Sequence, residues 1–556
     1  MNFKENETTT KLRGGYYTDP LLASFLLKWV LHTCPQAILE PSCGDGVFFR
    51  VLSDLKPDCV KSITGFEIEP VEAAKARDAG LALRHAEVEV LSRDFLGWSL
   101  TQLMKPPAYD AVVGNPPFIR YQYLDNGLQE ISRAIFDFFR LPFTKHTNAW
   151  VPFVISSLAL LRPGGRLAMV VPAELLHILH AESLRVFLTR ACSRVLIFDP
   201  RELWFKDTLQ GAILLLAERK PLDDSVFRGV GIIPTRSKSF LSDDPEDYFS
   251  RANFTNGETV NGKWMLALLT DSERAILQKA RHNPKVYSFG DIAEVAVGIV
   301  TGANKFFLVP DAIVSEFGLR DWAHPMFGRS EHVPGVVYDA TAIKRNKQLG
   351  LPTNFIWFTD ERIRDLPASV RDYIKMGELE GIHKRYKCRI REPWYSVPSV
   401  YSTSVGMLKR CHDFPRLILN KAKAYTTDTA YRVTPKLFDG LSLVFSFVNS
   451  LTALTAELEG RHYGGGVLEL VPSEIRRLLV PVRSATEATV NRLDAMIRRA
   501  VESDVLLAKQ DNSILNRIGF TKQESEELLN AWSRLRLRRQ RQKVDGLDDV
   551  ERDKPI

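Results

Sequence analysis

Ile38-Leu-Glu-Pro-Ser-Cys-Gly-Asp-Gly46 joins a short apolar segment to a turn with two glycines, and a helical pattern follows from Val47. Glycine lets a backbone come close to a ligand, and the N–H groups of a starting helix face such a turn. Open α/β sheets bind ligands at the carboxyl ends of their strands. This stretch therefore predicts a cofactor-binding loop between a strand and a helix of such a sheet.

The residues around this loop alternate between strand and helix patterns as far as about residue 220. Strand patterns cover residues 37–40, 62–67, 109–114, 166–171, 195–199 and 211–217, and helical patterns cover 21–31, 71–79 and 151–161. Such alternation is typical of an open, mostly parallel sheet with helices on its faces. We therefore expect an α/β, Rossmann-like domain over residues 1–229.

The composition is that of an ordinary globular chain. Of 556 residues, 45% are hydrophobic and 25% are charged, and the net charge is +7. The length predicts about three to four domains. The composition excludes collagen-like, disordered and disulfide-rich small proteins. The mildly basic balance permits a nucleic-acid partner.

Other sequence features bear on metals and membranes. The six cysteines form no C-x-x-C pair, which argues against a zinc site and a disulfide framework. No segment reaches the ~18 apolar residues of a membrane span. The polar N-terminus lacks the apolar core of a signal peptide. We expect no metal, no membrane contact and a cytoplasmic location.

A second motif, Asp110-Ala-Val-Val-Gly-Asn-Pro-Pro-Phe118, runs from an apolar strand straight into a stiff turn. The two prolines fix their φ angles and hold the preceding residues extended. The turn thus presents two acceptors, the Asn115 side-chain oxygen and the Pro116 carbonyl, beside the flat face of Phe118. A planar amine such as N6 of adenine fits: its two N–H groups meet the acceptors and its ring stacks on Phe118. With both hydrogens accepted, the nitrogen lone pair can turn towards a methyl donor.

Two acidic residues end neighbouring strand patterns. Glu67 ends the strand pattern at 62–67, where an acid commonly binds ribose hydroxyls in this architecture. Asp94 lies at a third strand end and could accept from an adenine amino group. The simpler role for Glu67 is that of a surface acid capping the following helix, and Asp94 alone would be unremarkable.

The order of these motifs resembles that of the gamma-class, Taq-type N6-adenine DNA methyltransferases of restriction–modification systems. Gly15-Tyr-Tyr-Thr-Asp-Pro20 precedes the loop, and Asn115-Pro-Pro-Phe118 follows it. The resemblance implies S-adenosylmethionine as cofactor, held by Thr18, Glu40, Ser42, Gly44, Glu67, Ile68, Asp94 and Phe95. It implies catalysis by Asn115, Pro116, Pro117 and Phe118, with Phe118 and Phe205 stacking on the flipped base and Trp204 competing with Phe205. One departure is Phe118 in place of tyrosine, which keeps the stacking face.

The rest of the chain is expected to recognise the DNA, because extruding a base costs free energy that contacts elsewhere must offset. We assign a mixed α+β target-recognition domain to residues 230–485 and a helical C-terminal extension with a basic end to 486–556. Basic residues with interleaved aromatics suit a nucleic-acid groove. The DNA-binding candidates are Lys305, Lys384, Arg385, Lys387, Arg389 and Arg461, with Trp394 and Tyr395 as neighbouring aromatics.

Capping-box patterns at Ser484-x-x-Glu487 and Thr521-x-x-Glu524 predict two helices in the extension. The second runs into Arg534–Lys543, which has six basic residues and no acid. This run is interpreted either as a solvated helix end or as a tail that contacts phosphate or a partner.

The expected partner is double-stranded DNA, with a cognate restriction endonuclease acting separately, and one chain is expected to work as a monomer. Three alternatives stay open. One is methylation of RNA adenine or protein glutamine, which also uses Asn-Pro-Pro-aromatic turns. Another is a non-catalytic DNA-binding subunit that retains the fold. The third is a modification subunit that needs a separate specificity subunit.

Overall fold

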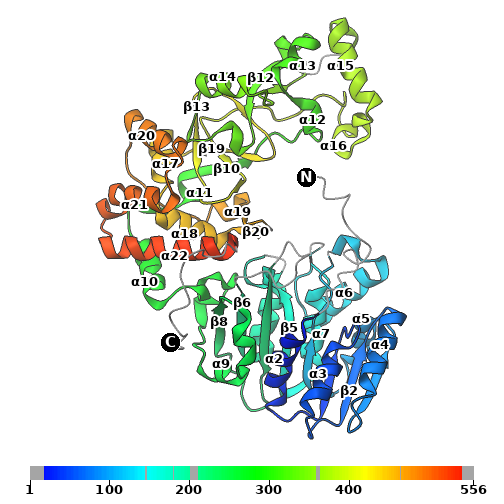
Figure 1. Cartoon of the computed structure of the whole chain (residues 1–556). Helices are drawn as coiled ribbons and strands as arrows, with labels where there is room; N and C mark the ends of the chain where they lie inside the picture. The colour runs from blue at the N-terminus through cyan, green and yellow to red at the C-terminus, as the bar shows by residue number, and fades with distance from the viewer. Residues whose placement is uncertain are drawn as a thin grey trace. The chain divides into compact units, whose positions relative to one another are not determined.

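The structure is a computed structural model that describes residues 18–119, 121–144, 147–178, 181–200, 211–358, 363–463 and 465–540. The described chain forms two compact units that meet in sequence at Leu269 and Thr270. Figure 1 shows both units, the first running from blue to green. The expected boundaries lay at residues 229 and 485 instead.

The first unit is built on one eight-stranded sheet with the order β3-β2-β1-β4-β5-β7-β6-β8. All its neighbouring strands are parallel except those beside β7, which runs antiparallel to β5 and β6. The bounds are β1 Ala37–Glu40, β2 Ser62–Phe66, β3 Glu87–Leu91, β4 Tyr109–Gly114, β5 Leu161–Pro172, β6 Cys192–Pro200, β7 Ala212–Arg219 and β8 Gly229–Thr235. This architecture confirms the predicted α/β, Rossmann-like fold. It also puts the carboxyl ends of β1 to β4 at one edge.

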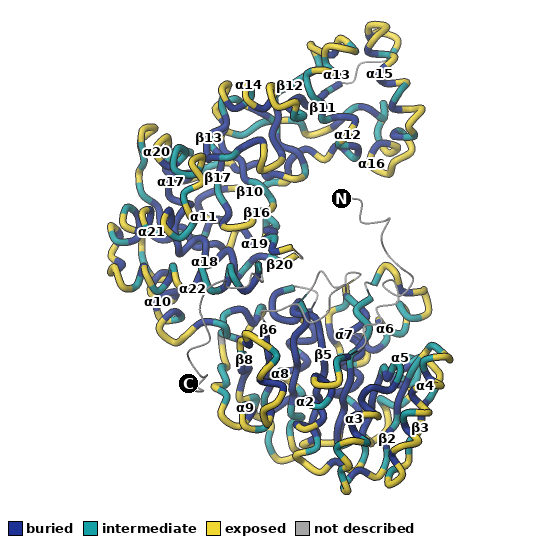
Figure 2. The backbone as a smooth tube through the Cα atoms, viewed as in Figure 1, coloured by how far each residue is buried: buried dark blue, intermediate teal, exposed yellow. Residues whose placement is uncertain are grey.

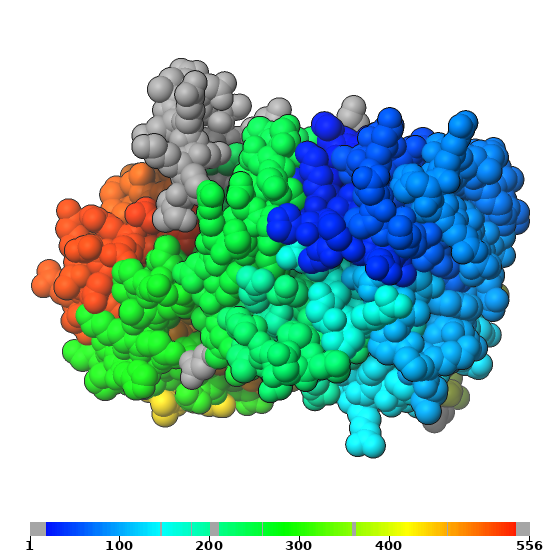
Figure 3. Space-filling view, turned by 90° about the horizontal axis from the view of Figure 1, so that it is seen from below, coloured from blue at the N-terminus to red at the C-terminus, as the bar shows by residue number. Residues whose placement is uncertain are grey.

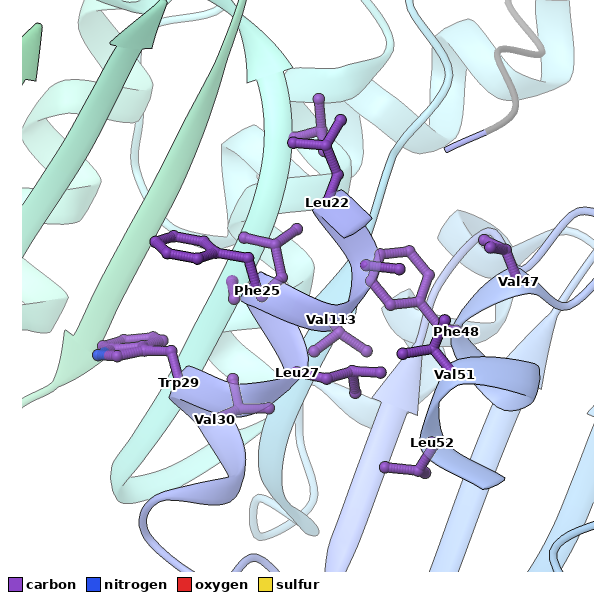
Figure 4. Close-up of a cluster of buried hydrophobic side chains, with 14 of the residues drawn as sticks. Leu22, Phe25, Leu27, Trp29, Val30, Val47, Phe48, Val51, Leu52 and Val113 are labelled. Atoms are coloured by element: carbon purple, nitrogen blue, oxygen red, sulfur yellow. The ribbon is translucent and has the colours of Figure 1, made fainter. Parts of the chain in front are cut away.

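Helices cover this sheet, and their apolar faces form its core. The helices are α2 Pro20–Leu31, α3 Val47–Leu55, α4 Pro70–Gly80, α5 Phe95–Gln102, α6 Asn126–Phe138, α7 Trp150–Leu160, α8 Glu182–Ala191 and α9 Pro245–Arg251. Figure 4 shows the contact of α2 and α3 with the sheet, where Val113 of β4 lies beside Leu27. Phe25 of α2 packs edge-on against Phe198 of β6, with ring centroids 5.1 Å apart. The strands are the most deeply buried part of the unit (Figure 2).

Residues 230–269 belong to this first unit because charged and aromatic contacts bind them to it. Arg166 of β5 is only 4% exposed, and it donates to Glu246 of α9 at 2.6 Å. The same guanidinium lies 4.7 Å from the ring centre of Trp29 in α2. Figure 3 shows the surface where the blue residues of α2 adjoin the green residues of α9. The first unit therefore extends past the expected boundary at residue 229.

The second unit is a mixed α+β structure. One sheet has the order β10-β19-β15-β17-β13 and another β11-β14-β12-β18. Their strands are β10 Ala293–Val297, β11 Leu308–Val309, β12 Ala323–Phe327, β13 Val337–Tyr338, β14 Asn354–Ile356, β15 Val405–Leu408, β17 Leu417–Asn420, β18 Tyr425–Thr426 and β19 Ala430–Pro435. Between them lie α12 Asn304–Phe307, α13 Asp311–Glu316, α14 Ala340–Gln348, α15 Ala368–Leu379 and α16 Tyr386–Arg389. A smaller sheet joins β16 Arg410–Cys411, β20 Arg461–Tyr463 and β21 Val467–Glu469.

A group of helices completes the second unit. It comprises α10 Asp271–His282, α17 Gly440–Ser446, α18 Ser450–Glu459, α20 Glu487–Arg498, α21 Ser503–Ser513 and α22 Lys522–Gln540. The predicted capping box of α22 is present, since Thr521 and Glu524 exchange hydrogen bonds of 2.8 and 3.1 Å. The one predicted at Ser484 is wrong. Thr486 caps α20 instead, because its side chain accepts from the Thr489 N–H.

The basic run at the end of α22 is not a solvated helix end within the part that the structure describes. Arg539 and Glu457 of α18 are both fully buried and pair at 2.7 Å. Arg534 pairs with Glu273 of α10, also at 2.7 Å. A buried cation that lacked its partner would be strongly destabilising. The arginines of α22 therefore bind this helix to its unit, and the interpretation as a solvated end is wrong for residues 534–540.

Candidate functional site

The carboxyl edge of the first sheet gathers the polar residues that the sequence singled out. Glu40 ends β1, Glu67 follows β2, Asp94 follows β3 and Asn115 follows β4. Because β1 pairs with β2 on one side and with β4 on the other, its loop lies between Glu67 and Asn115. Ligands bind open α/β sheets in this position.

The loop after β1 is held to β2 by its backbone. The Cys43 N–H donates to the Phe66 carbonyl at 2.8 Å, and the Gly44 N–H donates to Glu67 Oε2 at 3.0 Å. The other carboxylate oxygen of Glu67 accepts from the Glu69 N–H at 2.9 Å. Gly44 has a φ of +51°, and a Cβ there would meet no atom within 4 Å. The loop thus leaves open space beside Gly44.

Glu40 is a buried carboxyl at this edge whose surroundings suit a cationic ligand. It is 1% exposed, and within the described chain neither of its carboxylate oxygens has a hydrogen-bond partner. Burial, with Asp45 and Glu67 nearby, raises the pKa of Glu40 well above its usual value, while Arg50 lowers it. Arg50 itself binds Asp45 at 2.8 Å. A buried carboxylate without a partner is costly, and a cationic ligand would relieve that cost.

The turn after β4 is positioned by residues far away in sequence. Ser42 of the cofactor loop donates its hydroxyl to the Asn115 carbonyl at 3.1 Å. The Asn115 amide nitrogen donates to the Thr18 hydroxyl at 3.3 Å, and Thr18 is buried. The Asn115 amide is thus anchored at its nitrogen by Thr18. Phe118 is half-buried against the core beneath the sheet.

The remaining cofactor candidates differ in exposure. Ile68 is 59% exposed after β2, as a residue that flanks a ligand would be. Asp94 caps α5 by accepting from the Gly97 N–H, and burial raises its pKa. Phe95 is 2% exposed and packs edge-on against Phe66, with ring centroids 5.4 Å apart. Its ring is thus part of the core beneath the edge.

Sequence reasoning missed a polar pair beside the Asn115 turn. Glu174 follows β5 and accepts from the Asn148 side chain at 2.9 Å. The next N–H, of Ala149, donates to the Ile119 carbonyl at 2.8 Å, directly after Phe118. The pair therefore braces the turn from β5. Its signal in the sequence was an acid three residues after the predicted strand at 166–171.

Several predicted residues of the first unit lie outside the described residues. They are Phe205, its neighbour Trp204, and the motif before Thr18. Within the part of the chain that the structure describes, there is no cluster of three His, Cys, Asp or Glu side chains that could hold a metal. Among the same residues no single helix is long and apolar enough to cross a membrane, although the bent pair of α17 and α18 passes that test together.

The DNA-binding candidates all lie in the second unit. Lys305, Lys384, Arg385, Lys387 and Arg389 are exposed. Arg461 is half-buried and pairs with the buried Glu474 at 3.1 Å. Trp394 and Tyr395 are mostly turned inward: Tyr395 is 3% exposed, and Trp394 packs on Phe306. Both rings therefore pack against the core of this unit, Tyr395 within it and Trp394 at its edge.

Comparison with known proteins gives two family matches. The Eco57I restriction-modification methylase family matches residues 74–202, and the C-terminal domain of type II methyltransferase M.Eco57I matches residues 261–515. Type II methyltransferase M.AccI of Acinetobacter calcoaceticus is 22% identical over 482 residues, covering 83% of this chain and 84% of that protein. A tRNA1(Val) (adenine(37)-N6)-methyltransferase of Porphyromonas gingivalis is 27% identical and covers 41% of this chain and 81% of its own length. A solved DrdV–DNA complex is similar with a TM-score of 0.48 at 11% identity, covering 88% of this chain and 57% of that one.

Proposed function

Because the chain belongs to the gamma-class restriction–modification DNA methyltransferases, we propose that it methylates N6 of an adenine flipped out of duplex DNA. The family resemblance drawn from the motifs is confirmed, and S-adenosylmethionine is the cofactor. The observation that carries the proposal is the position of Asn115-Pro-Pro-Phe118. This turn leaves β4 next to the β1 loop and is tied to it through Ser42.

The residues at the β1 edge fit this cofactor. S-adenosylmethionine brings a methyl group on a positively charged sulfur together with an α-ammonium group. We propose that Glu40 provides the negative charge these cations need, since its carboxylate is buried without a partner in the described chain. Gly44 leaves room for the ligand. Thr18, Ser42, Glu67, Ile68, Asp94 and Phe95 complete the proposed cofactor site.

Glu67 can serve a ribose although both of its oxygens accept backbone N–H groups. A carboxylate offers about four lone-pair sites, so two remain for hydroxyl donors. Asp94 likewise keeps acceptor capacity for an amino group beyond its bond to Gly97. Ile68 offers an exposed apolar face. For Phe95 the core packing favours an indirect contribution, in which its ring supports Asp94 from below.

The proposed methyl transfer depends on how the adenine amine is oriented, and it needs no strong base. Asn115 and the Pro116 carbonyl accept the two N6 hydrogens, so the nitrogen lone pair leaves conjugation with the ring. The lone pair forms the new N–C bond while the C–S bond breaks, and the nitrogen then releases one proton to water. Phe118 stacks on the adenine, and Pro117 stiffens the turn. Positioning and local electrostatics lower the barrier.

The second unit supports DNA as the substrate. The match to M.AccI extends over 83% of the chain, whereas the match to the tRNA enzyme covers 41%. We therefore propose that residues 270–540 recognise the target sequence and offset the cost of base extrusion, a few kcal/mol. We further propose that the chain acts as a monomer and that a separate endonuclease completes the system.

The experiment combines the protein with S-adenosylmethionine and unmethylated plasmid DNA, followed by digestion to nucleosides and mass spectrometry. N6-methyldeoxyadenosine is expected, and Asn115→Ala should form none while still binding cofactor. Sequencing the modified plasmid then gives the target site. N4-methyldeoxycytidine, or a mark on RNA alone, would contradict the proposal.

A further inference from the structure

In the second unit, two segments far apart in sequence form one surface, which we call the α16 surface. It consists of residues 297–305 and residues 384–391. Arg391 donates to the Val300 carbonyl at 2.6 Å and to the Thr301 carbonyl at 2.8 Å. A Cβ on Gly302 would lie 2.6 Å from the Lys387 Cβ, so the two backbones are in direct contact there. The surface is therefore rigidly braced and is no loose loop.

Four apolar side chains of the α16 surface are exposed to water, and Val297 and Val300, at 42% and 39%, are the less exposed two. Tyr386 is 63% exposed and Ile390 is 61% exposed. They are four residues apart at the two ends of one helical turn and therefore lie on the same face. Cys388, between them in sequence, is fully buried in the core on the opposite side. The fold thus anchors the turn through Cys388 and directs Tyr386 and Ile390 outward.

Cations surround these two side chains. Lys384, Arg385, Lys387 and Arg389 are exposed, and none has an acidic partner within ion-pair distance among the described residues. Lys387 Nζ lies 5.6 Å and Arg389 Cζ 5.7 Å from the centre of the Tyr386 ring. Lys305, on the neighbouring segment, is also exposed. Glu392 is the sole acid between His383 and Pro393 in the sequence. Such a field attracts a polyanion.

Leu379 gives a useful contrast in the same unit. It is 90% exposed, more than either Tyr386 or Ile390. Its sequence neighbours are Glu378 and Glu380, which repel phosphate. Exposed apolar area alone therefore does not mark the α16 surface. What distinguishes the α16 surface is an exposed apolar pair surrounded by cations that have no acidic partner among the described residues.

We propose that Tyr386 and Ile390 form a wedge that enters the base stack of duplex DNA while the surrounding cations hold its phosphates. Proteins that bend or open DNA insert apolar side chains between base steps, and aromatic rings flanked by cations stack on bases. The wedge rests on the proposed function in one respect, namely that the substrate is duplex DNA. It adds the means by which the second unit loosens the stack.

DNA unwinding gives the first test, because it needs no knowledge of the target sequence. Full-length protein with S-adenosylhomocysteine is bound to closed circular plasmid, which topoisomerase I then relaxes. An inserted wedge unwinds the duplex and shifts the linking number. Tyr386→Ala and Ile390→Ala should lose most of the shift at saturating protein, whereas Leu379→Ala keeps it. An unchanged shift in both wedge variants would overturn the proposal.

The salt dependence of DNA affinity distinguishes the contribution of the wedge from that of the surrounding cations. The affinity for a 30-bp duplex is measured against salt concentration by fluorescence anisotropy. Lys387→Ala and Arg389→Ala should each reduce the slope of log affinity against log salt by about 0.9. Tyr386→Ala and Ile390→Ala should weaken binding about tenfold with the slope unchanged. If the wedge variants bind like Leu379→Ala, or if double-stranded RNA competes as well as DNA, the proposal fails.

These readouts also separate failure of the wedge from failure of the proposed function. Neither unwinding nor binding requires methyl transfer. If unwinding depends on Tyr386 and Ile390 but no methylated adenine forms, the wedge stands and the proposed reaction falls. If methylation proceeds normally in the wedge variants and unwinding is unchanged, the reaction stands and the wedge falls. Circular dichroism of each variant confirms folding, since all the substituted side chains are exposed.

Discussion

The amide nitrogen of Asn115 lies 3.3 Å from the hydroxyl of Thr18, although 97 positions separate the two residues. Thr18 stands just before α2, whereas Asn115 directly follows β4. The hydroxyl therefore anchors the Asn115 amide from a distant part of the chain. We infer that this anchor helps Asn115 to accept from the adenine amine.

Removing the Thr18 hydroxyl should slow the reaction. Thr18→Val keeps the shape of the side chain but cannot accept from Asn115, so we expect kcat to fall by about ten- to a hundredfold, as for other positioning contacts. Thr18→Ser keeps the hydroxyl and should stay within about threefold of wild type. Steady-state kinetics with a plasmid substrate measure both. If Thr18→Val changes only the KM for cofactor, the hydroxyl serves binding and not Asn115.

Alanine substitutions at three glycines with positive φ can distinguish the effects of a steric clash, of backbone strain and of lost space for the ligand. Gly46→Ala should lower the free energy of unfolding by about 2–4 kcal/mol, because its Cβ would meet the Ala76 Cα at 2.8 Å as well as a φ of +84°. Gly164→Ala has open space around it and should cost only about 1 kcal/mol. Gly44→Ala should resemble Gly164→Ala in stability but lose at least about tenfold in cofactor affinity. Urea unfolding measures the stability of the three variants, and calorimetric titration measures their cofactor affinity. Normal cofactor affinity in Gly44→Ala would exclude this loop as the cofactor site.

The buried carboxyl of Glu40 should make cofactor binding depend on pH. Its pKa is raised in the free protein, so it is protonated over a range above its usual value. A cationic ligand favours the ionised form and so lowers that pKa again, which releases a proton. Affinity should therefore increase as pH rises from the usual carboxyl value through the raised one. Titration in two buffers of different ionisation enthalpy detects the proton, and Glu40→Gln should remove it. If cofactor affinity depends on pH equally in wild type and in Glu40→Gln, this role of Glu40 is contradicted.

Asp511 of α21 should make the second unit less stable as pH rises. It accepts from the Ser450 N–H at 2.9 Å and from the Ser450 hydroxyl, yet burial raises its pKa to about 7. A raised carboxyl pKa gives stability that is fully present below the unfolded pKa and is lost as pH rises through the folded one. Unfolding free energy should fall by about 2–4 kcal/mol between pH 4 and 7. Asp511→Asn should flatten this decline; an unchanged slope would show that another group titrates.

Much of the first unit could be predicted because its signals are local. The strands Ala37–Glu40 and Tyr109–Gly114 have the predicted bounds, since each is an apolar run that ends at a glycine or proline turn. Parallel strands then bring Glu40, Glu67, Asp94 and Asn115 to one edge without further information. The specific roles of these residues stay predictions.

Other features gave no local signal. The pairing of Asn148 with Glu174 and that of Arg539 with Glu457 join polar residues 26 and 82 positions apart, and no periodicity marks such contacts. The basic end of α22 resembled a solvated tail for this reason, since its acidic partners lie on other helices. Trp394 and Tyr395 follow a basic stretch in the sequence yet pack against the core, and the sequence pattern alone does not distinguish these two environments.

The most direct test of the Asn115 mechanism is a single-turnover measurement. Wild type and Asn115→Ala are each saturated with labelled S-adenosylmethionine and mixed, in excess over the DNA, with duplex carrying the mapped target site. We expect wild type to transfer the methyl group in one fast phase. Asn115→Ala should bind cofactor and DNA with unchanged affinity but transfer at least about a thousandfold more slowly. A single-turnover rate within tenfold of wild type would contradict the claim that Asn115 activates the adenine amine.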